Sequence, residues 1–583
     1  MKQKSSRIPY IKAIPEILKY QLVTKLILAM MIVCSRFIGT KLLASTGRVA
    51  VSSGDFGFLF VTWQGWLMLL LFLTVFFFYV AIDLNVKIIY SDNIIRGVKE
   101  PMRKVFTDGI LSVFNLFSVS GFGVILYITL IAPIVGVGFS IGLTEGLKIP
   151  NFITSVIHDT PLYNVLYTVT VIVLAAVGFV YIFTLHGILL NNLKVRKAEA
   201  QSFSIIRHNL FSFLWQNITF TLFVAIPIII AAVLFILLPL AVISLLTLPE
   251  FLSRFLMLFV MLFGLCVSGA ASLLASPFLT LKITQLYYKY TAPEKINPQP
   301  PEKGKSIPKL VYVLVPILCI AIAFGGASAF DEIFPAAVTT QIVAHRGGGN
   351  EGPENTVAGI NKAVELGASG SEIDIQRTKD GAYIVNHDNG FSRVAGVDAD
   401  VGSLTLEEVK KLTVLDTGEP IATFEEMLEA SRGRITLFIE LKGVSADIQM
   451  CDDAVEIVRS MGMENEVVFI SLKYNLIDYL ESTYPEMQTG YLTFLSYGNT
   501  EKLNCDYIGL EEESATSTAI ESVHAQGKKL LVWTVNTLDS QEHFLASKAD
   551  GIITDNVVQA NDVIDKLNNR SDLERVLSII RQF

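Results

Sequence analysis

The chain has 583 residues, of which 52% are hydrophobic and 17% are charged, and its formal net charge is −8. A soluble domain averages about 25% charged residues, so this composition indicates a protein that is partly embedded in a membrane. The length suggests more than one domain. No basic cluster accompanies the modest negative charge, which argues against a nucleic-acid-binding protein.

The apolar residues are concentrated in the first 330 positions. A helix that crosses a bilayer needs about 20 largely apolar residues. Arg36 lies near the middle of the first candidate, which weakens it, because an arginine is costly at the centre of a bilayer. We expect residues 1–330 to form a polytopic α-helical membrane domain. Its seven expected spans are roughly 22–45, 56–82, 117–143, 161–189, 217–246, 255–281 and 309–329.

Basic residues alternate between the segments that connect these spans. They gather at the N-terminus and in segments 83–109, 190–212 and 282–309, and are sparse in 46–55, 144–160 and 247–254. Because positively charged loops stay in the cytoplasm, this alternation predicts a multi-pass protein of the plasma membrane. Seven spans would put the residues after 330 outside the cell, and one missed or false span would reverse that orientation.

After residue 330, short β-rich segments alternate with amphipathic helical patterns. Strands are expected at 342–345, 371–375, 435–441, 466–471, 489–494, 507–510, 529–535 and 551–554. Eight strands, mostly separated by helices, in roughly 220 residues predict an α/β fold, the (β/α)8 TIM barrel. A ninth segment, 382–387, follows a hairpin signal at Asp380-Gly381, so we expect it to lie outside the eight, as an arm on the second strand.

Local signals mark several helix ends in this half. Thr405 with Glu408, and Thr423 with Glu426, are candidate capping boxes, and Gly367 is placed to end a helix at 356–366. Cysteines are few, and no Cys/His spacing indicates zinc. A disulfide between Cys451 and Cys505 remains the less favoured alternative to two free thiols.

Charged and titratable residues recur at the C-terminal ends of the predicted strands, where barrel enzymes place their chemistry. Residues two apart on a strand point to the same side, as in the Glu372/Asp374 and Glu440/Lys442 pairs. Any one of these residues alone is more often a packing or surface residue, and their joint pattern is what favours a site. The set is His345, Arg346, Glu372, Asp374, His387, Asp388, Glu440 and Lys442.

This set suits the cleavage of a phosphodiester. Three carboxylates supply hard oxygen ligands for Mg²⁺ or Ca²⁺, and a divalent cation neutralises the charge of phosphate. Arg346 and Lys442 can hold the remaining phosphate oxygens. Two histidines can divide the proton transfers between them, one as base and one as acid for the leaving alkoxide.

The same residues resemble a known family. His345-Arg346-Gly347, followed after five residues by Pro353-Glu354-Asn355-Thr356, is similar to the opening motif of glycerophosphodiester phosphodiesterases. The resemblance covers about 341–560, and the N-terminal half resembles the membrane domain attached to this enzyme in some Gram-positive bacteria. Val557 stands where the family often has a proline, which affects a turn. Later motifs match in order and spacing at 372–374, 378–381, 387–388, 439–442, 532–536 and 550–555.

The resemblance implies metal-dependent hydrolysis of glycerophosphodiesters to sn-glycerol 3-phosphate and an alcohol. Trp533 would line the substrate cleft, and the alternative is an aromatic residue of the barrel core. Glu354 and Asn355 would brace the site, unless Asn355 or Thr356 simply caps the next helix. The resemblance implies that Glu372, Asp374 and Glu440 are metal ligands. It implies that His345 and His387 are the acid and base, and that Arg346 and Lys442 contact the phosphate.

We therefore expect a membrane domain over 1–330, a TIM-barrel enzyme domain over 335–565 and a helical tail over 566–583. The substrate would be a lipid headgroup, a glycerol-phosphate polymer or a soluble diester, cleaved at the outer membrane face. An alternative is a membrane transporter or assembly factor that uses the barrel as a glycerophosphate-binding module. A sphingomyelinase-like lyase on the same barrel is a third, less favoured interpretation.

Overall fold

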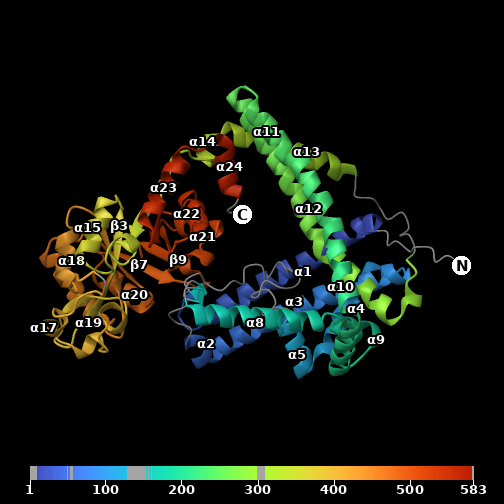
Figure 1. Ribbon diagram of the computed structural model, residues 1–583, viewed down its shortest axis with the longest axis horizontal. Coiled ribbons are helices and arrows are strands. Elements are labelled where there is room, and N and C mark those ends of the chain that lie inside the picture. The colour runs from blue at the N-terminus through green and yellow to red at the C-terminus, as the bar shows by residue number, and fades with distance from the viewer. Residues whose placement is uncertain are drawn as a thin grey trace. The chain divides into compact units, whose positions relative to one another are not determined.

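A computed structural model of the chain describes residues 10–48, 50–52, 57–127, 153–154, 157–158, 160–298, 309–415, 417–494 and 496–580 (Figure 1). The chain falls into two compact units. The first comprises Met1–Gly39, Leu67–Ile149 and Thr154–Phe330, and the second comprises Thr40–Trp66, Pro150–Ile153 and Asp331–Phe583.

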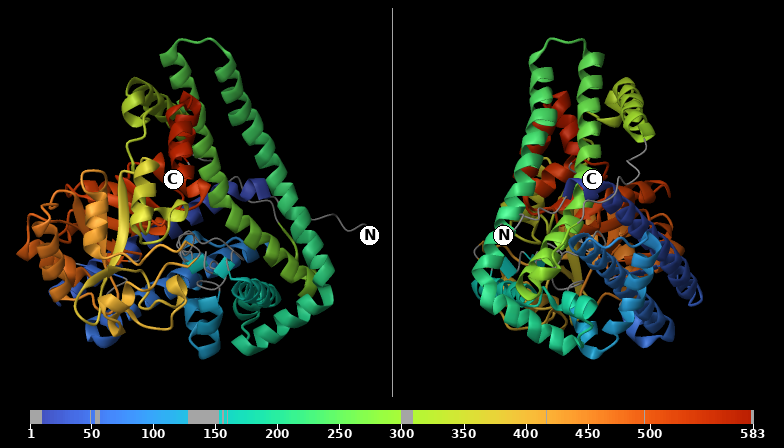
Figure 2. Two further views of the ribbon diagram at one scale, coloured as in Figure 1. Left: turned by 60° about the vertical axis from the view of Figure 1, so that its left-hand side comes forward. Right: turned by 90° about the vertical axis from the view of Figure 1, so that its right-hand side faces the viewer.

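The N-terminal part of the chain is helical. Among the described residues, five helical stretches are long and apolar enough to cross a membrane: Ala13–Ala44, Trp63–Arg96, Pro161–Asn191, Val195–Leu245 and Glu250–Thr291. They correspond to α1 (Tyr10–Ala44), α3 (Trp63–Arg96), α8 and α9 (Pro161–Val180 and Thr184–Asn191), α10 with η4 and α11 (Val195–Ala232, Val233–Leu237 and Leu238–Leu245), and α12 (Glu250–Thr291). Helix α12 packs against α10 and α11 (Figure 2).

Two further apolar segments bear on the expected spans. Helices Met102–Leu116 and Val119–Leu126 pass the same test as a pair bent by 116°, which would make a sixth span, and α13 (Lys309–Ser328) contains a shorter apolar helix, Val313–Ser328. Much of the expected span 117–143 lies outside the described residues. A polytopic α-helical membrane domain is therefore confirmed, while the number of seven spans stays a prediction.

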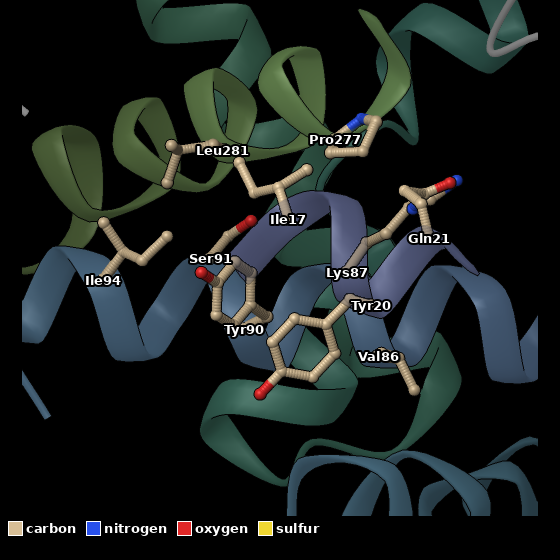
Figure 3. Close-up of a pocket in the computed structure, with 10 residues that line it drawn as sticks. All are labelled: Ile17, Tyr20, Gln21, Val86, Lys87, Tyr90, Ser91, Ile94, Pro277 and Leu281. Atoms are coloured by element: carbon tan, nitrogen blue, oxygen red, sulfur yellow. The ribbon is translucent and has the colours of Figure 1, made fainter. Parts of the chain in front are cut away.

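Helix α3 runs further than its apolar segment. The sequence predicts a connecting segment from residue 83 onward, but the helix continues to Arg96 because polar side chains pair along it at i and i+4. Lys87 Nζ lies 2.6 Å from Asp83 Oδ2 and donates a hydrogen bond to Ser276 Oγ of α12. Figure 3 shows a pocket here between α1, α3 and α12, in which Lys87 lies beside Gln21.

The second unit contains a closed parallel barrel, as predicted. Its order is β2-β11-β10-β9-β7-β6-β5-β3, and β3 pairs back onto β2. Strand β4 (Tyr383–Val385) pairs antiparallel with β3, so 382–387 is the expected hairpin arm. The eight barrel strands are β2 (Gln341–Ala344), β3 (Gly370–Arg377), β5 (Thr436–Leu441), β6 (Val467–Ser471), β7 (Gln488–Thr493), β9 (Tyr507–Glu511), β10 (Lys529–Trp533) and β11 (Gly551–Thr554).

Helices surround these strands (Figure 1). Both predicted capping boxes are present, at the starts of α17 (Leu406–Val409) and α18. Thr356, and not Asn355, caps α15, Gly367 has a φ of 76°, and Cys451 and Cys505 are free. The longer helices of this half are α15 (Val357–Glu365), α18 (Phe424–Ser431), α19 (Ile448–Ser460), α20 (Tyr474–Thr483), α21 (Ser517–His524), α22 (Leu538–Leu545), α23 (Val557–Asn568) and α24 (Asp572–Ile580).

The strands divide their side chains between two apolar clusters. Ile373 and Ile375 belong to the large cluster between the strands and the helices, whereas Phe438 belongs to the cluster inside the barrel. Because side chains alternate along a strand, Glu372 and Asp374 of β3, and Glu440 of β5, point to the inside. The barrel therefore directs these three carboxylates toward its axis.

One small sheet was not predicted. Strand β1 (Ala50–Ser52), which lies between α1 and α3 in the sequence, pairs antiparallel with β8 (Ser496–Gly498) in the connection between β7 and β9. Both strands belong to the second unit. Ala50 and Val51 are buried, and Ala50 joins the outer apolar cluster of the barrel. Three residues are too few to show a strand pattern in the sequence.

A cross-link tests this pairing. Val51 lies opposite Tyr497, and opposed residues of an antiparallel pair are about 4.5–5.5 Å apart at Cα, within the range of about 4.4–6.8 Å that a disulfide spans. With the exposed Cys34 and Cys266 replaced by serine, Val51→Cys combined with Tyr497→Cys should form a disulfide on mild oxidation, detected by peptide mass spectrometry. Val51→Cys with Asn504→Cys is the out-of-register control, and equal cross-linking of both pairs would contradict the register.

Candidate active site

Three buried carboxylates form the centre of the candidate site. Glu372, Asp374 and Glu440 each offer an oxygen within 4.8 Å of the other two. Asp374 and Glu440 are register partners on β3 and β5, and Glu372 follows from the i, i+2 spacing on β3. Adjacent parallel strands thus bring together the three residues that the sequence predicts as a cation site.

Lys442 lies among these carboxylates. Its Nζ is 3.0 Å from Asp374 Oδ1 and 2.9 Å from Glu440 Oε2. Burial disfavours the charged lysine, but the two carboxylates outweigh burial and raise the pKa of Lys442 above its usual range. Lys442 is therefore held as a charged ammonium group at the centre of the site, among the three carboxylates.

The carboxylates carry more negative charge than one lysine neutralises. Burial, with the nearby charge of Asp374, raises the pKa of Glu372, and burial likewise raises the pKa of Glu440. Burial also opposes ionisation of Asp374, but the charges of Lys442 and His387 and the hydrogen bond from Asn355 together outweigh burial and keep the pKa of Asp374 low. Such crowding of buried acids is relieved by a cation with two charges.

The donor set fits a hard divalent cation. Mg²⁺ and Ca²⁺ prefer oxygen ligands, and second partners orient the carboxylates here. Arg346 N donates to Glu372 Oε2 at 2.9 Å, and Asn355 Nδ2 donates to Asp374 Oδ2 at 2.9 Å. Outer partners of this kind hold metal ligands in place. Asn355 therefore braces the site through Asp374.

Arg346 and Asn355 both have unusual backbone conformations. Their φ angles are 49° and 54°, in the left-handed region that residues with a side chain rarely adopt. The Asn355 N–H donates to the Arg346 carbonyl oxygen at 2.7 Å, so that the two segments hold each other. This geometry turns the Arg346 N–H toward Glu372, and strain of this type is typical of functional sites.

A carboxylate directly after the last barrel strand orients His345. His345 Nδ1 lies 2.6 Å from Asp555 Oδ1, and Asn536 Nδ2 hydrogen-bonds to Asp555 Oδ2. The Nε2 of His345 faces Glu372 Oε2 at 3.9 Å. Burial lowers the pKa of His345, but the bond to Asp555 and the charge of Glu372 reverse this effect and leave the pKa raised. His345 thus presents its Nε2 to the carboxylate cluster.

His387 has a similar arrangement on the hairpin arm. Its Nδ1 lies 2.7 Å from Asp388 Oδ1, and Arg393 Nε donates to Asp388 Oδ2 at 2.7 Å. Arg393 also pairs with Glu354, which in turn accepts a hydrogen bond from Arg346 at 3.2 Å. Burial lowers the pKa of His387. Glu354 thus braces the site by joining two arginines, and the pKa values of the two histidines shift in opposite directions.

Trp533 ends β10 and is partly buried against the apolar cluster inside the barrel. Its strand, β10, lies between β9 and β11. Glu511 ends β9, and Asp555 directly follows β11. This position is compatible with both of its predicted roles.

Of the two aspartates that orient the histidines, Asp555 was missing from the predicted set, and Asp388 was in the set without an assigned role. Asp555 ends a motif that the sequence singles out, and a carboxylate just after the last strand is a signal that could have identified it. Asp388 follows His387 directly, which gives a weaker signal. Arg393 lies in the short helix α16 (Ser392–Ala395) between β4 and α18, where no pattern marks it.

Two family models match this chain. The model of the "Glycerophosphoryl diester phosphodiesterase family" matches residues 345–559, and that of the "Membrane domain of glycerophosphoryl diester phosphodiesterase" matches residues 9–325, more than half of the chain. The glycerophosphodiester phosphodiesterase of Caldanaerobacter subterraneus subsp. tengcongensis is 30% identical over 235 residues, covering 37% of this chain and 94% of that protein. Human glycerophosphodiester phosphodiesterase 1 is 24% identical over 258 residues, covering 37% and 78% respectively.

Among solved structures, a phosphodiesterase from Oleispira antarctica in complex with the product sn-glycerol-3-phosphate is 24% identical, with a TM-score of 0.37, covering 39% of this chain and 97% of that one. The family matches cover the helical part and the barrel separately. The chain therefore belongs to the glycerophosphodiester phosphodiesterase family and is a phosphoric diester hydrolase with a membrane domain.

Proposed function

We propose that the barrel hydrolyses glycerophosphodiesters to sn-glycerol 3-phosphate and an alcohol in a reaction that requires a divalent cation. The observation that carries this proposal is the cluster of Glu372, Asp374 and Glu440 around Lys442, with two histidines beside it. Mg²⁺ or Ca²⁺ bound by the three carboxylates would neutralise phosphate charge as it builds up in the transition state.

The chain's own residues supply the remaining steps. Lys442 and Arg346 hold the phosphate oxygens. One of His345 and His387 accepts the proton of the attacking hydroxyl, and the other protonates the alkoxide as its bond to phosphorus breaks. Asp555 and Asp388 fix the tautomer and the direction of these imidazole rings, as carboxylates do for catalytic histidines elsewhere. Trp533 lines the substrate site beside them.

We further propose that the enzyme is a multi-pass protein of the plasma membrane with the barrel outside the cell. The alternation of basic residues between the expected connecting segments supports this orientation. Substrates at the outer face would be lipid headgroups, glycerol-phosphate polymers or soluble diesters.

Product analysis tests the proposed reaction. Purified full-length protein should release sn-glycerol 3-phosphate from glycerophosphocholine, and chelator should stop the release. His345→Ala and His387→Ala should each lower kcat by about 10²–10⁴-fold, the usual contribution of general acid–base catalysis. His524→Ala is the control, because His524 also pairs with an aspartate, Asp550, but at the other end of β11. A cyclic phosphate product would indicate a lyase, and binding without turnover would indicate a binding module.

The metal assignment predicts a specific binding defect. Glu372→Gln removes one charged ligand, so the Mg²⁺ concentration for half-maximal activity and for half-maximal thermal stabilisation should both rise about tenfold or more, since tenfold corresponds to 1.4 kcal/mol. Glu365→Gln, at an exposed carboxylate of α15, should leave both unchanged. Identical metal titrations for Glu372→Gln and the parent would refute the ligand.

The role of Asp555 can be separated from folding. Asp555→Asn keeps the shape of the side chain but lets an amide donate to His345 Nδ1, which favours the wrong tautomer; kcat should fall by up to about 10⁴-fold with KM nearly unchanged. Asp550→Asn makes the same change in the His524 pair and should retain full kcat. Equal kcat for Asp555→Asn and the parent would show that the His345–Asp555 bond has no part in turnover.

A further inference from the structure

The exposed apolar residues of the barrel are unevenly distributed. Among the described residues of 341–571, five large apolar side chains are largely exposed: Leu415, Val444, Ile448, Leu538 and Val558. Val444 is the most exposed, at 86%. Single exposed apolar residues need no explanation, but a group on one face indicates a contact surface.

Four of these five side chains lie on the face that carries the candidate site. Val444 and Ile448 follow β5, Leu538 begins α22 after β10, and Val558 lies in the first turn of α23 after β11. Segments that follow the strands of a parallel barrel lie at its C-terminal face. Among the described residues, the segments that lead into the strands from 366 to 550 expose no large apolar side chain. These four apolar residues therefore lie on the same face as the carboxylates and histidines, and we call them the apolar rim.

The β1–β8 sheet extends the same face. Strand β8 follows β7, so it too lies at the C-terminal end of a barrel strand. Its partner β1 is followed within the same unit by Phe60, Val61, Trp63 and Trp66, whose exposed fractions are 61%, 84%, 64% and 58%. Trp63 and Trp66 stand at the start of α3, a candidate membrane span, and Phe60 and Val61 end the short helix α2 (Gly57–Val61) that precedes it. Aromatic residues at the ends of spans lie at the interface between lipid and water.

We propose that the apolar rim lies against the surface of the lipid bilayer, so that the site takes a glycerophosphodiester held in that bilayer by its apolar part. The proposal rests on the proposed function and specifies its substrate class. Two observations converge on it: exposed apolar side chains follow three of the barrel strands on the face that carries the site, and strand β1, which precedes the aromatic span end in the same unit, is paired to a loop of that face. Water-soluble substrates would reach the same site without using the rim.

Turnover of matched substrates tests this surface. Full-length protein in phosphatidylcholine vesicles would be assayed for choline release from soluble glycerophosphocholine and from lysophosphatidylcholine inserted in the vesicles. The double variant Val444→Ser/Leu538→Ser should lower kcat/KM for the lipid substrate tenfold or more and change that for the soluble substrate less than twofold. Leu577→Ser, at an exposed apolar residue of α24, is the control and should change neither.

The outcomes are distinct. Equal losses for both substrates, or no loss for either, would overturn the bilayer surface, as would a parent protein that cleaves only the soluble diester or only a glycerol-phosphate polymer. A parent that cleaves no diester at all would contradict the proposed function itself.

A second measurement does not depend on activity. In protein with Cys34 and Cys266 replaced by serine, a fluorophore attached through Val444→Cys should be quenched by nitroxide-labelled lipids in the vesicles, whereas the same fluorophore attached through Leu577→Cys should not. Equal quenching at both positions would contradict contact between the apolar rim and the bilayer.

Discussion

Burial of three carboxylates beside one another is the constraint on which the enzyme half of this protein depends. Glu372, Asp374 and Glu440 lie inside a closed barrel, where each negative charge is poorly solvated and repels the others. Lys442 offsets part of this cost. The fold tolerates the remainder because the strands that carry these residues are fixed by apolar packing on their other side, where Ile373 and Ile439 are fully buried.

The second layer of the site limits how these groups can move. Asn355 and Arg346, in left-handed conformations, hold the outer oxygens of two carboxylates. Asp555 and Asp388 hold the histidines from behind. When the side chains of a site are already in position, little free energy is needed to rearrange them as charge develops on a bound phosphate. The unusual backbone and the histidine–aspartate pairs therefore serve the same requirement.

The sequence predicts the barrel well because its signals are local. Strand periodicity, the Asp380-Gly381 hairpin and the capping residues Thr405 and Thr423 each depend on neighbours in the chain, and each is confirmed. The E-x-D and E-x-K spacings also predict the carboxylate cluster, since i and i+2 share a side of a strand.

Features that depend on polar side-chain pairs or on distant contacts were not predicted. Arg393, in the short helix α16, joins Glu354 to Asp388. Strand β1 is defined by its partner β8, far away in the sequence, and not by any pattern of its own. Helix α3 passes the end of its apolar segment because Asp83 and Asp92 find basic partners one turn later. In each case the determining interaction is polar or long-range, and hydrophobic periodicity does not report it.

We propose that the three carboxylates hold a divalent cation while Lys442 turns to phosphate. Diffraction from crystals soaked in Mn²⁺ and sn-glycerol 3-phosphate would show both groups at once. We expect an anomalous peak within about 2.0–2.6 Å of oxygens from Glu372, Asp374 and Glu440, with Lys442 Nζ bonded to a phosphate oxygen. A peak bound elsewhere, or Lys442 still paired with both carboxylates beside bound product, would contradict the proposal.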